Sequence, residues 1–353
     1  MRAVCFGLFV LRAVLAAAAG ADTNQFMPAG PGSYYFKAAN LLFHPVHYRP
    51  VPEKTSGLAS NRLLLDGAWL LDAAPGDNVR AMSLSGPAWA PFKVPGQWLQ
   101  QGFDVPQDQP VAVAKEFVIP KEWAGNRIVL RFDGLHAGTT CWLNGLKLGY
   151  TENLFTPVEW DITEAARVGQ TNRLDLQMKV ATVSEKLSYS SGYAFHNLGG
   201  IDRSVRVFAL PPTHIRQLHL DAGLDADCRD GDLQMNLVLE SEDAPAQGLA
   251  LLIELRDPSG KRIEHSLPRV AIGPFRGAQT IHFVTRVAKP LPWSAEKPCL
   301  YRLALELRQR GAVLERVERN VGFRKIELRG RQLYVNGHRV KVAGACHHET
   351  DPL

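Results

Sequence analysis

Cysteine is scarce in this chain of 353 residues, with five in all and no C-x-x-C pair. Cys5 would leave with an export signal, and the other four lie far apart, so a structural zinc site is not expected. Export would permit a disulfide, and Cys228 and Cys299 could form one within a single module. We expect buried free thiols instead. The sequence therefore predicts no metal and no other cofactor.

Several other signatures are also missing. The sequence has no segment of ten or more residues with a convincing 3.6-residue period. A nucleophile elbow, a phosphate-binding G-x-x-x-x-G-K-[ST] loop and an H-E-x-x-H helix are absent. Charge is nearly balanced, with 40 Lys and Arg against 35 Asp and Glu. The small basic excess alternates with apolar residues between Tyr301 and Lys341, without a basic–aromatic stripe, and we expect no nucleic-acid partner.

A long apolar run occurs only at the N-terminus. Arg2 precedes an apolar stretch over Ala3–Ala19, and Ala19-Gly20-Ala21 has the small-x-small pattern of a cleavage site. Arg12 interrupts the stretch, and an arginine there would cost a membrane-spanning helix about 2.5–3.5 kcal/mol. The sequence predicts a signal peptide over residues 1–21 and a secreted or periplasmic mature protein without a membrane anchor.

A two-residue period dominates the chain after residue 60. Alternation of apolar with polar residues is typical of half-buried antiparallel strands. It is clearest in residues 127–132, 174–180, 233–239, 249–255 and 301–307. The fold class predicted is therefore all-β, built of sandwiches.

Short turns and one short helix can also be predicted. Asn144-Gly145 and Asn336-Gly337 each separate two strand-like stretches, as in hairpins whose type I′ turns need positive φ at both central residues. The best helical candidate is Glu164–Val168, which follows Thr163 as N-cap and ends before Gly169.

Pro211-Pro212 divides the chain into modules. Residues 22–212 are too long for a minimal immunoglobulin-type sandwich, whereas residues 213–324 are close to its usual ~100 residues. Residues 325–353 begin a hairpin and a strand, Val340–Ala345, that is typical of a strand in a buried sheet. Because that strand has no partner here, we expect the sequence to be the front part of a longer protein.

Short motifs follow one another in a fixed order from about residue 60. They are L-x-G-x-W at Leu65–Trp69, V-P-G-x-W at Val94–Trp98, a dense stretch over Val129–Thr163, G-G-I-x-R-x-V within Leu198–Val205, G-F-R-x-I-E within Val321–Glu327, and Gly344–Pro352. Together they resemble the N-terminal part of glycoside hydrolase family 2, from its sugar-binding jelly roll through its immunoglobulin-like domain to the start of its (β/α)8 barrel.

The resemblance implies an activity. The family hydrolyses β-galactosides, β-mannosides and β-glucuronides with retention, and the loops here look most like its β-galactosidase branch. Retention requires two carboxyl groups about 5–5.5 Å apart, and the family carries both glutamates on later barrel strands, beyond Leu353. The expectation is a chain with no catalytic residue of its own, inactive alone. Its partners would be a β-linked oligosaccharide or polysaccharide and, in the full-length enzyme, further copies of itself.

The resemblance also implies substrate-binding residues near the C-terminus. His348 corresponds to the family's barrel histidine, which reaches the bound sugar. Glu349 is a substrate contact or a salt-bridging residue at the base of the site. Cys346 and His347 stand where the family usually has Asn-Arg, which leaves the exact sugar open. A metal shared by His347, His348 and Glu349 is not expected, because neighbouring residues on a strand point to opposite faces.

The loop Tyr189–Asn197 is the other candidate for sugar contacts. Tyr193 and His196 can stack on a sugar ring and Asn197 can bind its hydroxyls, unless the loop packs against the barrel instead. It contains no Asp or Glu, whereas well-known β-galactosidases bring an Asp from this loop to the substrate. The tryptophans at positions 69, 98 and 142 are expected in the jelly-roll core.

Two functions remain open from the sequence. One is the front part of a secreted β-glycosidase. The alternative is a stand-alone, non-catalytic module that binds carbohydrate or a protein. The stretch after Lys325 favours the first, because a finished binding module has no use for an isolated barrel strand.

Overall fold

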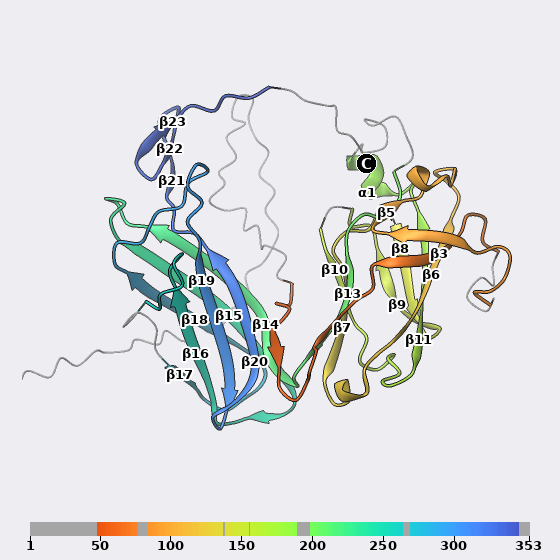
Figure 1. Cartoon of the computed structure of the whole chain (residues 1–353), viewed down its shortest axis with the longest axis horizontal. Coiled ribbons are helices and arrows are strands. Elements are labelled where there is room, and N and C mark those ends of the chain that lie inside the picture. Colours follow the sequence, from red (N-terminus) through yellow and green to blue (C-terminus); the bar gives the residue numbers. More distant parts are fainter. Residues whose placement is uncertain are drawn as a thin grey trace, which may run out of the picture. The chain divides into compact units, whose positions relative to one another are not determined.

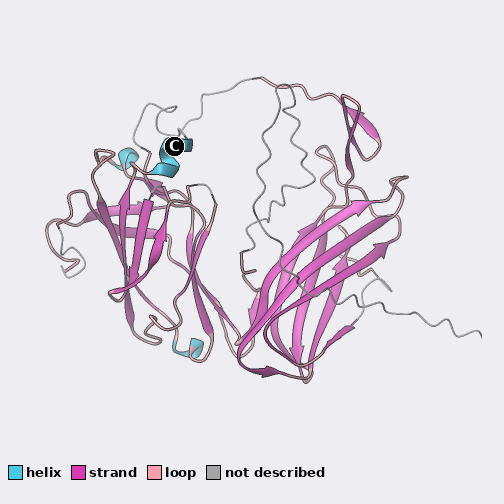
Figure 2. Ribbon diagram, turned by 180° about the vertical axis from the view of Figure 1, so that it is seen from behind, coloured by secondary structure: helices cyan, strands magenta, loops and turns pink. Residues whose placement is uncertain are grey.

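The computed structural model describes residues 48–76, 83–136, 138–154, 156–188, 198–263 and 269–345. Strands account for nearly all of the regular structure in these ranges, and helices are few and short (Figure 2). The all-β class predicted from the two-residue period is therefore confirmed. The described strands form two β-sandwiches, the first jelly-roll-like and the second immunoglobulin-like, and one small separate sheet.

The first sandwich has two main antiparallel sheets. One has the order β4 (Ala90–Val94), β3 (Gly67–Asp72), β6 (Val111–Val118), β11 (Thr171–Lys179), β8 (Gly138–Leu143) and β9 (Leu146–Thr151). The other has the order β10 (Val158–Asp161), β7 (Arg127–Phe132), β13 (Val205–Leu210) and β2 (Arg62–Leu64). A short pair joins β5 (Gly96–Gln97) to β12 (Gly200–Ile201), and the helical turns are η2 (Leu99–Gln101), η3 (Lys121–Trp123) and α1 (Val183–Ser188).

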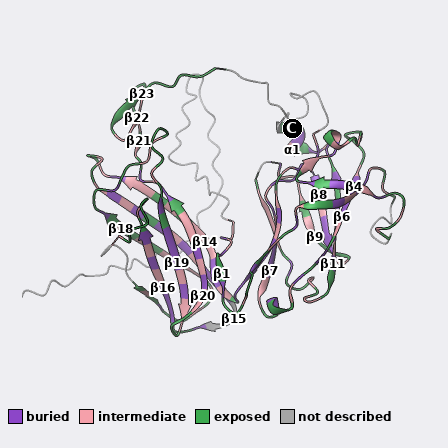
Figure 3. Ribbon diagram, in the orientation of Figure 1, coloured by how far each residue is buried: buried purple, intermediate pink, exposed green. Residues whose placement is uncertain are grey.

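Apolar residues on the inner faces of these sheets make one continuous core (Figure 3). Leu174, Leu176 and Met178 alternate along β11 and are all buried, as their spacing predicts for one face of a strand. Trp69 and Trp98 are also part of this core, as expected. Trp142 is buried too, but it lies outside the core, on the other face of β8 from Cys141 and Leu143.

The second sandwich has a five-stranded and a three-stranded sheet (Figure 1). The first has the order β1 (Lys54–Thr55), β20 (Ala312–Val321), β19 (Tyr301–Gln309), β16 (Leu249–Arg256) and β17 (Arg269–Ile272). The second has the order β14 (Thr213–Leu224), β15 (Gly231–Ala246) and β18 (Phe275–Val287). Their inner faces enclose a separate core that includes Leu233, Leu237, Leu251, Leu303 and Leu305.

The two predicted hairpins are confirmed. β8 and β9 pair across Asn144-Gly145, and both of these residues have positive φ, 52° and 85°. β22 (Gln332–Val335) and β23 (His338–Val340) pair across Asn336-Gly337, with φ of 51° and 78°, and β21 (Ile326–Arg329) completes this small sheet.

Two local predictions were wrong. Glu164–Val168 is not a helix, because the Thr163 hydroxyl bonds back to Asp161 at 2.6 Å and accepts the amide of Ile128 at 2.9 Å, which holds the segment as a turn. The strand predicted over Val340–Ala345 ends at Val340, and Val342 is 78% exposed rather than in a buried sheet. No neighbouring strand in the described ranges pairs with residues 341–345.

Three cysteines in the described ranges are free thiols. Cys141 is buried in the first core, and Cys228 and Cys299 are half-buried, so the disulfide left open from the sequence is not formed between them. No helix in the described part of the chain is long and apolar enough to cross a membrane.

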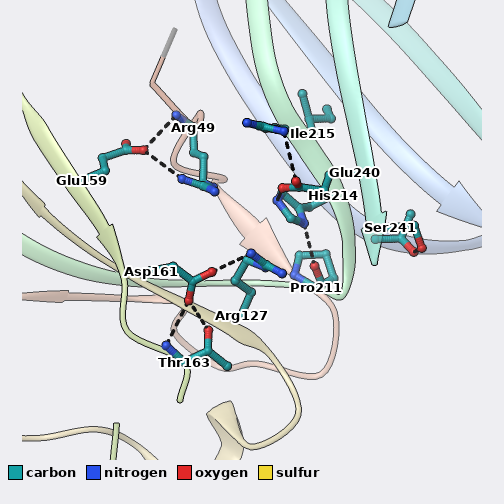
Figure 4. A network of polar contacts seen from close by, with 12 residues as sticks. Arg49, Arg127, Glu159, Asp161, Thr163, Pro211, His214, Ile215, Glu240 and Ser241 are labelled. Atoms are coloured by element: carbon teal, nitrogen blue, oxygen red, sulfur yellow. Dashed lines mark hydrogen bonds and ion pairs between the residues drawn. The ribbon is translucent and has the colours of Figure 1, made fainter. Parts of the chain in front are cut away.

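Polar side chains form a network around the connection from β13 to β14 (Figure 4). Asp161 accepts the guanidinium of Arg127 at 2.5 Å. His214 places Nδ1 at 3.1 Å from the Pro211 carbonyl and Nε2 at 3.3 Å from Glu240. The contacts of His214 join the start of β14 to the Pro211-Pro212 connection and to Glu240 on β15.

Candidate functional site

Two sequence motifs and the segment that carries His136 meet at one end of the first sandwich. β5, from V-P-G-x-W, pairs with β12, from G-G-I-x-R, through Gln97 opposite Gly200. The amide of His136 donates to the Gly200 carbonyl at 2.9 Å, and the amide of Gly200 donates back to His136 at 2.6 Å. The amide of Trp98 donates to the Gly199 carbonyl at 3.0 Å. Backbone hydrogen bonds therefore join three segments that are far apart in the sequence.

Only glycine fits at the centre of this junction. A Cβ at Gly199 would overlap the ring of Trp98, and a Cβ at Gly200 would overlap the carbonyl of Gly96. Gly200 also has φ of 148°, a conformation that other residues rarely adopt. The G-G pair is thus required by the close approach of two backbones and an indole ring.

A carboxyl group and an imidazole lie directly beside this junction. Asp202 follows β12, and its Oδ2 is 4.0 Å from Nδ1 of His136. Burial raises the pKa of Asp202, although His136, a hydrogen bond from Gln97 and the charge of Arg203 oppose the increase. His136 is only 2% exposed. Burial lowers its pKa, against the attraction of Asp202 and Glu185.

These opposite shifts favour the neutral forms of both groups. A neutral acid can donate and accept hydrogen bonds, and so can a neutral imidazole. The pair therefore places hydrogen-bonding groups where they can meet a polar ligand or position a nearby loop.

Helix α1 lies beside the His136–Asp202 pair, and Glu152 fixes the first turn of the helix. Glu152 accepts the amide of Ser184 at 3.0 Å and the hydroxyl of Tyr150 at 2.7 Å. Burial, together with this hydrogen bond to Glu152, raises the pKa of Tyr150 to about 12. Glu185, in the first turn of the helix, is buried near His136. The end of α1 at Ser188 leads directly into the loop 189–197.

The substrate-binding residues predicted from the sequence lie outside the described residues. Tyr193, His196 and Asn197 fall in the loop between α1 and Gly199, and His348 and Glu349 follow residue 345. The structure describes only what flanks them, so their roles stay predictions.

Sequence reasoning missed His136 and Asp202. Asp202 occupies the variable position of G-G-I-x-R, and His136 belongs to no motif, so only their burial and proximity identify them. No group of three or more His, Cys, Asp or Glu side chains in the described ranges is arranged to hold a metal ion.

Comparison with known families assigns both sandwiches to one class of protein, the β-domains of glycosyl hydrolases. The profile described as glycosyl hydrolase 2 galactose-binding domain-like matches residues 100–232. The profile described as glycosyl hydrolases family 2 matches residues 213–324. The chain belongs to glycosyl hydrolase family 2.

Curated relatives agree with this assignment. The chain is 30% identical over 327 residues to a β-galactosidase of Lactobacillus delbrueckii subsp. bulgaricus, a match that covers 85% of this chain and 31% of the relative. It is 27% identical over 319 residues to a β-galactosidase of Priestia megaterium, covering 82% of this chain and 30% of the relative. The chain thus spans about a third of the length of these relatives.

Solved structures share the fold. A β-glucuronidase of Bacteroides uniformis superimposes with a TM-score of 0.70 at 23% identity, covering 81% of this chain and 35% of the other. A family 2 member from Bacteroides cellulosilyticus gives a TM-score of 0.69 at 18% identity, covering 81% and 39%. At these identities the likeness shows the fold alone.

Proposed function

We propose that this chain is the N-terminal part of a retaining β-glycosidase of the β-galactosidase type. The observation that carries the proposal is the match to β-galactosidases over more than four fifths of the chain, through both sandwiches. In this proposal the two catalytic carboxylates lie outside residues 1–353, and the chain alone does not hydrolyse glycosides. Its substrate is a β-linked oligosaccharide or polysaccharide.

The first sandwich would contribute to the substrate site through the end that carries His136 and Asp202. Both groups are largely withdrawn from water at this end, and a sugar offers hydroxyl groups that can donate and accept hydrogen bonds. Hydrogen bonds from buried, pre-positioned groups to hydroxyls give a site its specificity for a sugar. The flanking loop 189–197, with Tyr193, His196 and Asn197, is proposed to supply the direct contacts.

Export and assembly form a further part of the proposal. The composition of residues 1–21 supports cleavage near Asp22 and a secreted or periplasmic location. N-terminal sequencing of the exported protein should then begin near Asp22, whereas an intact Met1 on the mature protein would contradict it. We also propose that the full-length enzyme forms a homo-oligomer.

One observation favours the alternative of a stand-alone carbohydrate-binding module. Each sandwich has its own buried core, the first built around Leu130 and Leu176 and the second around Leu237 and Leu305. Separate cores are what independently folding modules need. The alternative predicts a chain that folds, binds a glycan and needs no further domain.

Reading the gene beyond Leu353 and assaying the product tests both proposals. The enzyme proposal expects about 300 or more further residues of alternating strand and helix. The longer product should cleave nitrophenyl β-galactoside, while purified residues 1–353 should not, because the chain would lack the acid and the nucleophile. Reproducible turnover by residues 1–353 that is lost in Glu349→Gln would contradict the proposal.

A further inference from the structure

A pocket of about 520 Å³ opens in the immunoglobulin-like sandwich, between the edges of β14 and β20. This volume is in the range of small-molecule sites, about 300–1,000 Å³. Its polar lining includes Asp221 from β14, Asn320 from β20 and Arg324 after β20, and Trp293 contributes an aromatic wall. The pocket belongs to the second sandwich, and neither His136 nor Asp202 lines it.

Trp293 is held firmly in place. Its amide donates to the Phe323 carbonyl at 2.8 Å, and the side chain of Asn336 donates to the Trp293 carbonyl at 2.9 Å. A Cβ at Gly322 would lie 3.0 Å from Trp293 side-chain carbons, so the backbone there packs against the tryptophan. The Arg324 guanidinium carbon lies 5.0 Å from the ring centroid, over the ring. The wall is therefore formed before any ligand binds.

The polar side chains of the pocket have donors and acceptors that are available to a ligand. Asp221 and Asn320 are exposed, and no side-chain hydrogen bond or ion pair joins either of them to another described residue. The guanidinium of Arg324 is engaged by the Trp293 ring, which leaves its N–H groups available. Together the three side chains offer an acceptor, an amide that both donates and accepts, and several donors.

The charges and the apolar surface of the pocket define the class of ligand. Asp221 carries a negative charge and Arg324 a positive one, so the lining has no net charge and favours a neutral ligand. Leu300 and Ile326 also line the pocket and are 43% and 54% exposed, which leaves apolar surface beside the polar groups. A neutral molecule with many hydroxyls and apolar C–H faces matches this combination.

We propose that this pocket is a second saccharide-binding site, which takes a neutral sugar of one or two residues through Asp221, Asn320, Arg324 and the edge of Trp293. The site is separate from the end of the first sandwich where substrate contacts are proposed. It would hold the protein on a glycan while another part of the protein acts on the same glycan. The inference does not depend on the chain being part of an enzyme.

The test uses ¹⁵N-labelled full chain and lactose as the probe. The indole N–H resonance of Trp293 is assigned by its absence in Trp293→Phe, so that the readout reports on this pocket alone. Lactose should shift this resonance saturably, with a Kd near 1 mM, which is about −4 kcal/mol. Asp221→Ala and Asn320→Ala should each raise the Kd about tenfold or more, because each removes hydrogen bonds to the sugar.

Gln234→Ala is the matched control. Gln234 is exposed and lies opposite Asp221 in the β14–β15 ladder, but it does not line the pocket. The Kd should change less than about twofold in this variant. The proposal is overturned if lactose does not shift the Trp293 resonance at concentrations on the order of 100 mM, if Asp221→Ala and Asn320→Ala bind as the parent does, or if Gln234→Ala loses binding equally.

Discussion

Glu315 provides a sharp test of how burial controls the stability of the second sandwich. The residue lies in β20 and is completely buried. One of its carboxyl oxygens accepts the amide of Ile215 at the β-bulge of β14, and the other has no hydrogen-bond partner in the described part of the chain. Burial raises the pKa of Glu315 to about 8, although the Ile215 hydrogen bond acts in the opposite direction.

Whether the free energy of unfolding rises or falls with pH follows from the pKa of Glu315 in the unfolded and in the folded chain. The pKa is near 4.5 in the unfolded chain and about 8 in the folded one. Below pH 4.5 both states carry the proton and Glu315 imposes no charge penalty. As the pH rises, the unfolded chain releases the proton first, so the free energy of unfolding falls by about 1.4 kcal/mol per pH unit and levels off once the folded state ionises. The loss totals at most about 5 kcal/mol.

Glu315→Gln isolates this effect. The amide keeps a carbonyl oxygen for the Ile215 N–H but cannot ionise. Its buried NH₂ group adds a cost of about 1–3 kcal/mol that does not depend on pH. We therefore expect the variant to lose the decline between pH 5 and pH 8, and the difference between variant and parent to grow by about 2–5 kcal/mol in favour of the variant over that range.

The assay is urea unfolding at several pH values, followed through the indole resonance of Trp293. This is the only tryptophan in residues 213–353, so it reports on the second sandwich without interference from the first. Glu318→Gln is the control, because Glu318 lies on the same strand in ion pairs with Arg316 and Arg302 and is only partly buried. Parallel pH curves for the parent and Glu315→Gln would refute the reasoning.

Two further predictions concern packing and acid stability. Gly199→Ala should destabilise the first sandwich by about 3 kcal/mol or more, because its Cβ would overlap the Trp98 ring, whereas Gly223→Ala, which meets nothing within 4 Å, should change the melting temperature little. A hydrogen bond from His214 is the largest cause that lowers the pKa of Glu240, to about 2, so stability present above pH 4.5 should be lost as the pH falls toward 2. Glu240→Gln should flatten that acid limb in pH-dependent melting curves, and an unchanged limb would contradict the assignment.

Local patterns in the sequence predicted several of the strands. Alternation of apolar and polar residues predicted β7, β11, β15, β16 and β19, and Asn-Gly pairs predicted two hairpins. These signals succeed because side-chain direction in a strand and positive φ in a turn depend on residues that are close in sequence. The resemblance to family 2 likewise rested on short motifs.

Predictions failed where a distant or competing contact decides the conformation. The helix expected at Glu164–Val168 gave way to a turn, because the Thr163 hydroxyl bonds to Asp161 and Ile128 instead of capping a helix. At the end of the chain, alternation at Val340 and Val342 could not show whether another strand would pair with theirs. Alternation marks a face of a strand but does not supply the partner that buries it.

The sequence by itself determined the all-β class, the hairpins, two core tryptophans and the family. Only the tertiary structure decided which polar groups would share an environment. His136 and Asp202 are 66 positions apart in the printed sequence and meet because the backbone of His136 pairs with Gly200 of β12. Asp221, Asn320 and Trp293 come together at the edge of a sandwich. Burial and proximity set the protonation and binding capacity of such groups, and both arise when strands distant in sequence pack against each other.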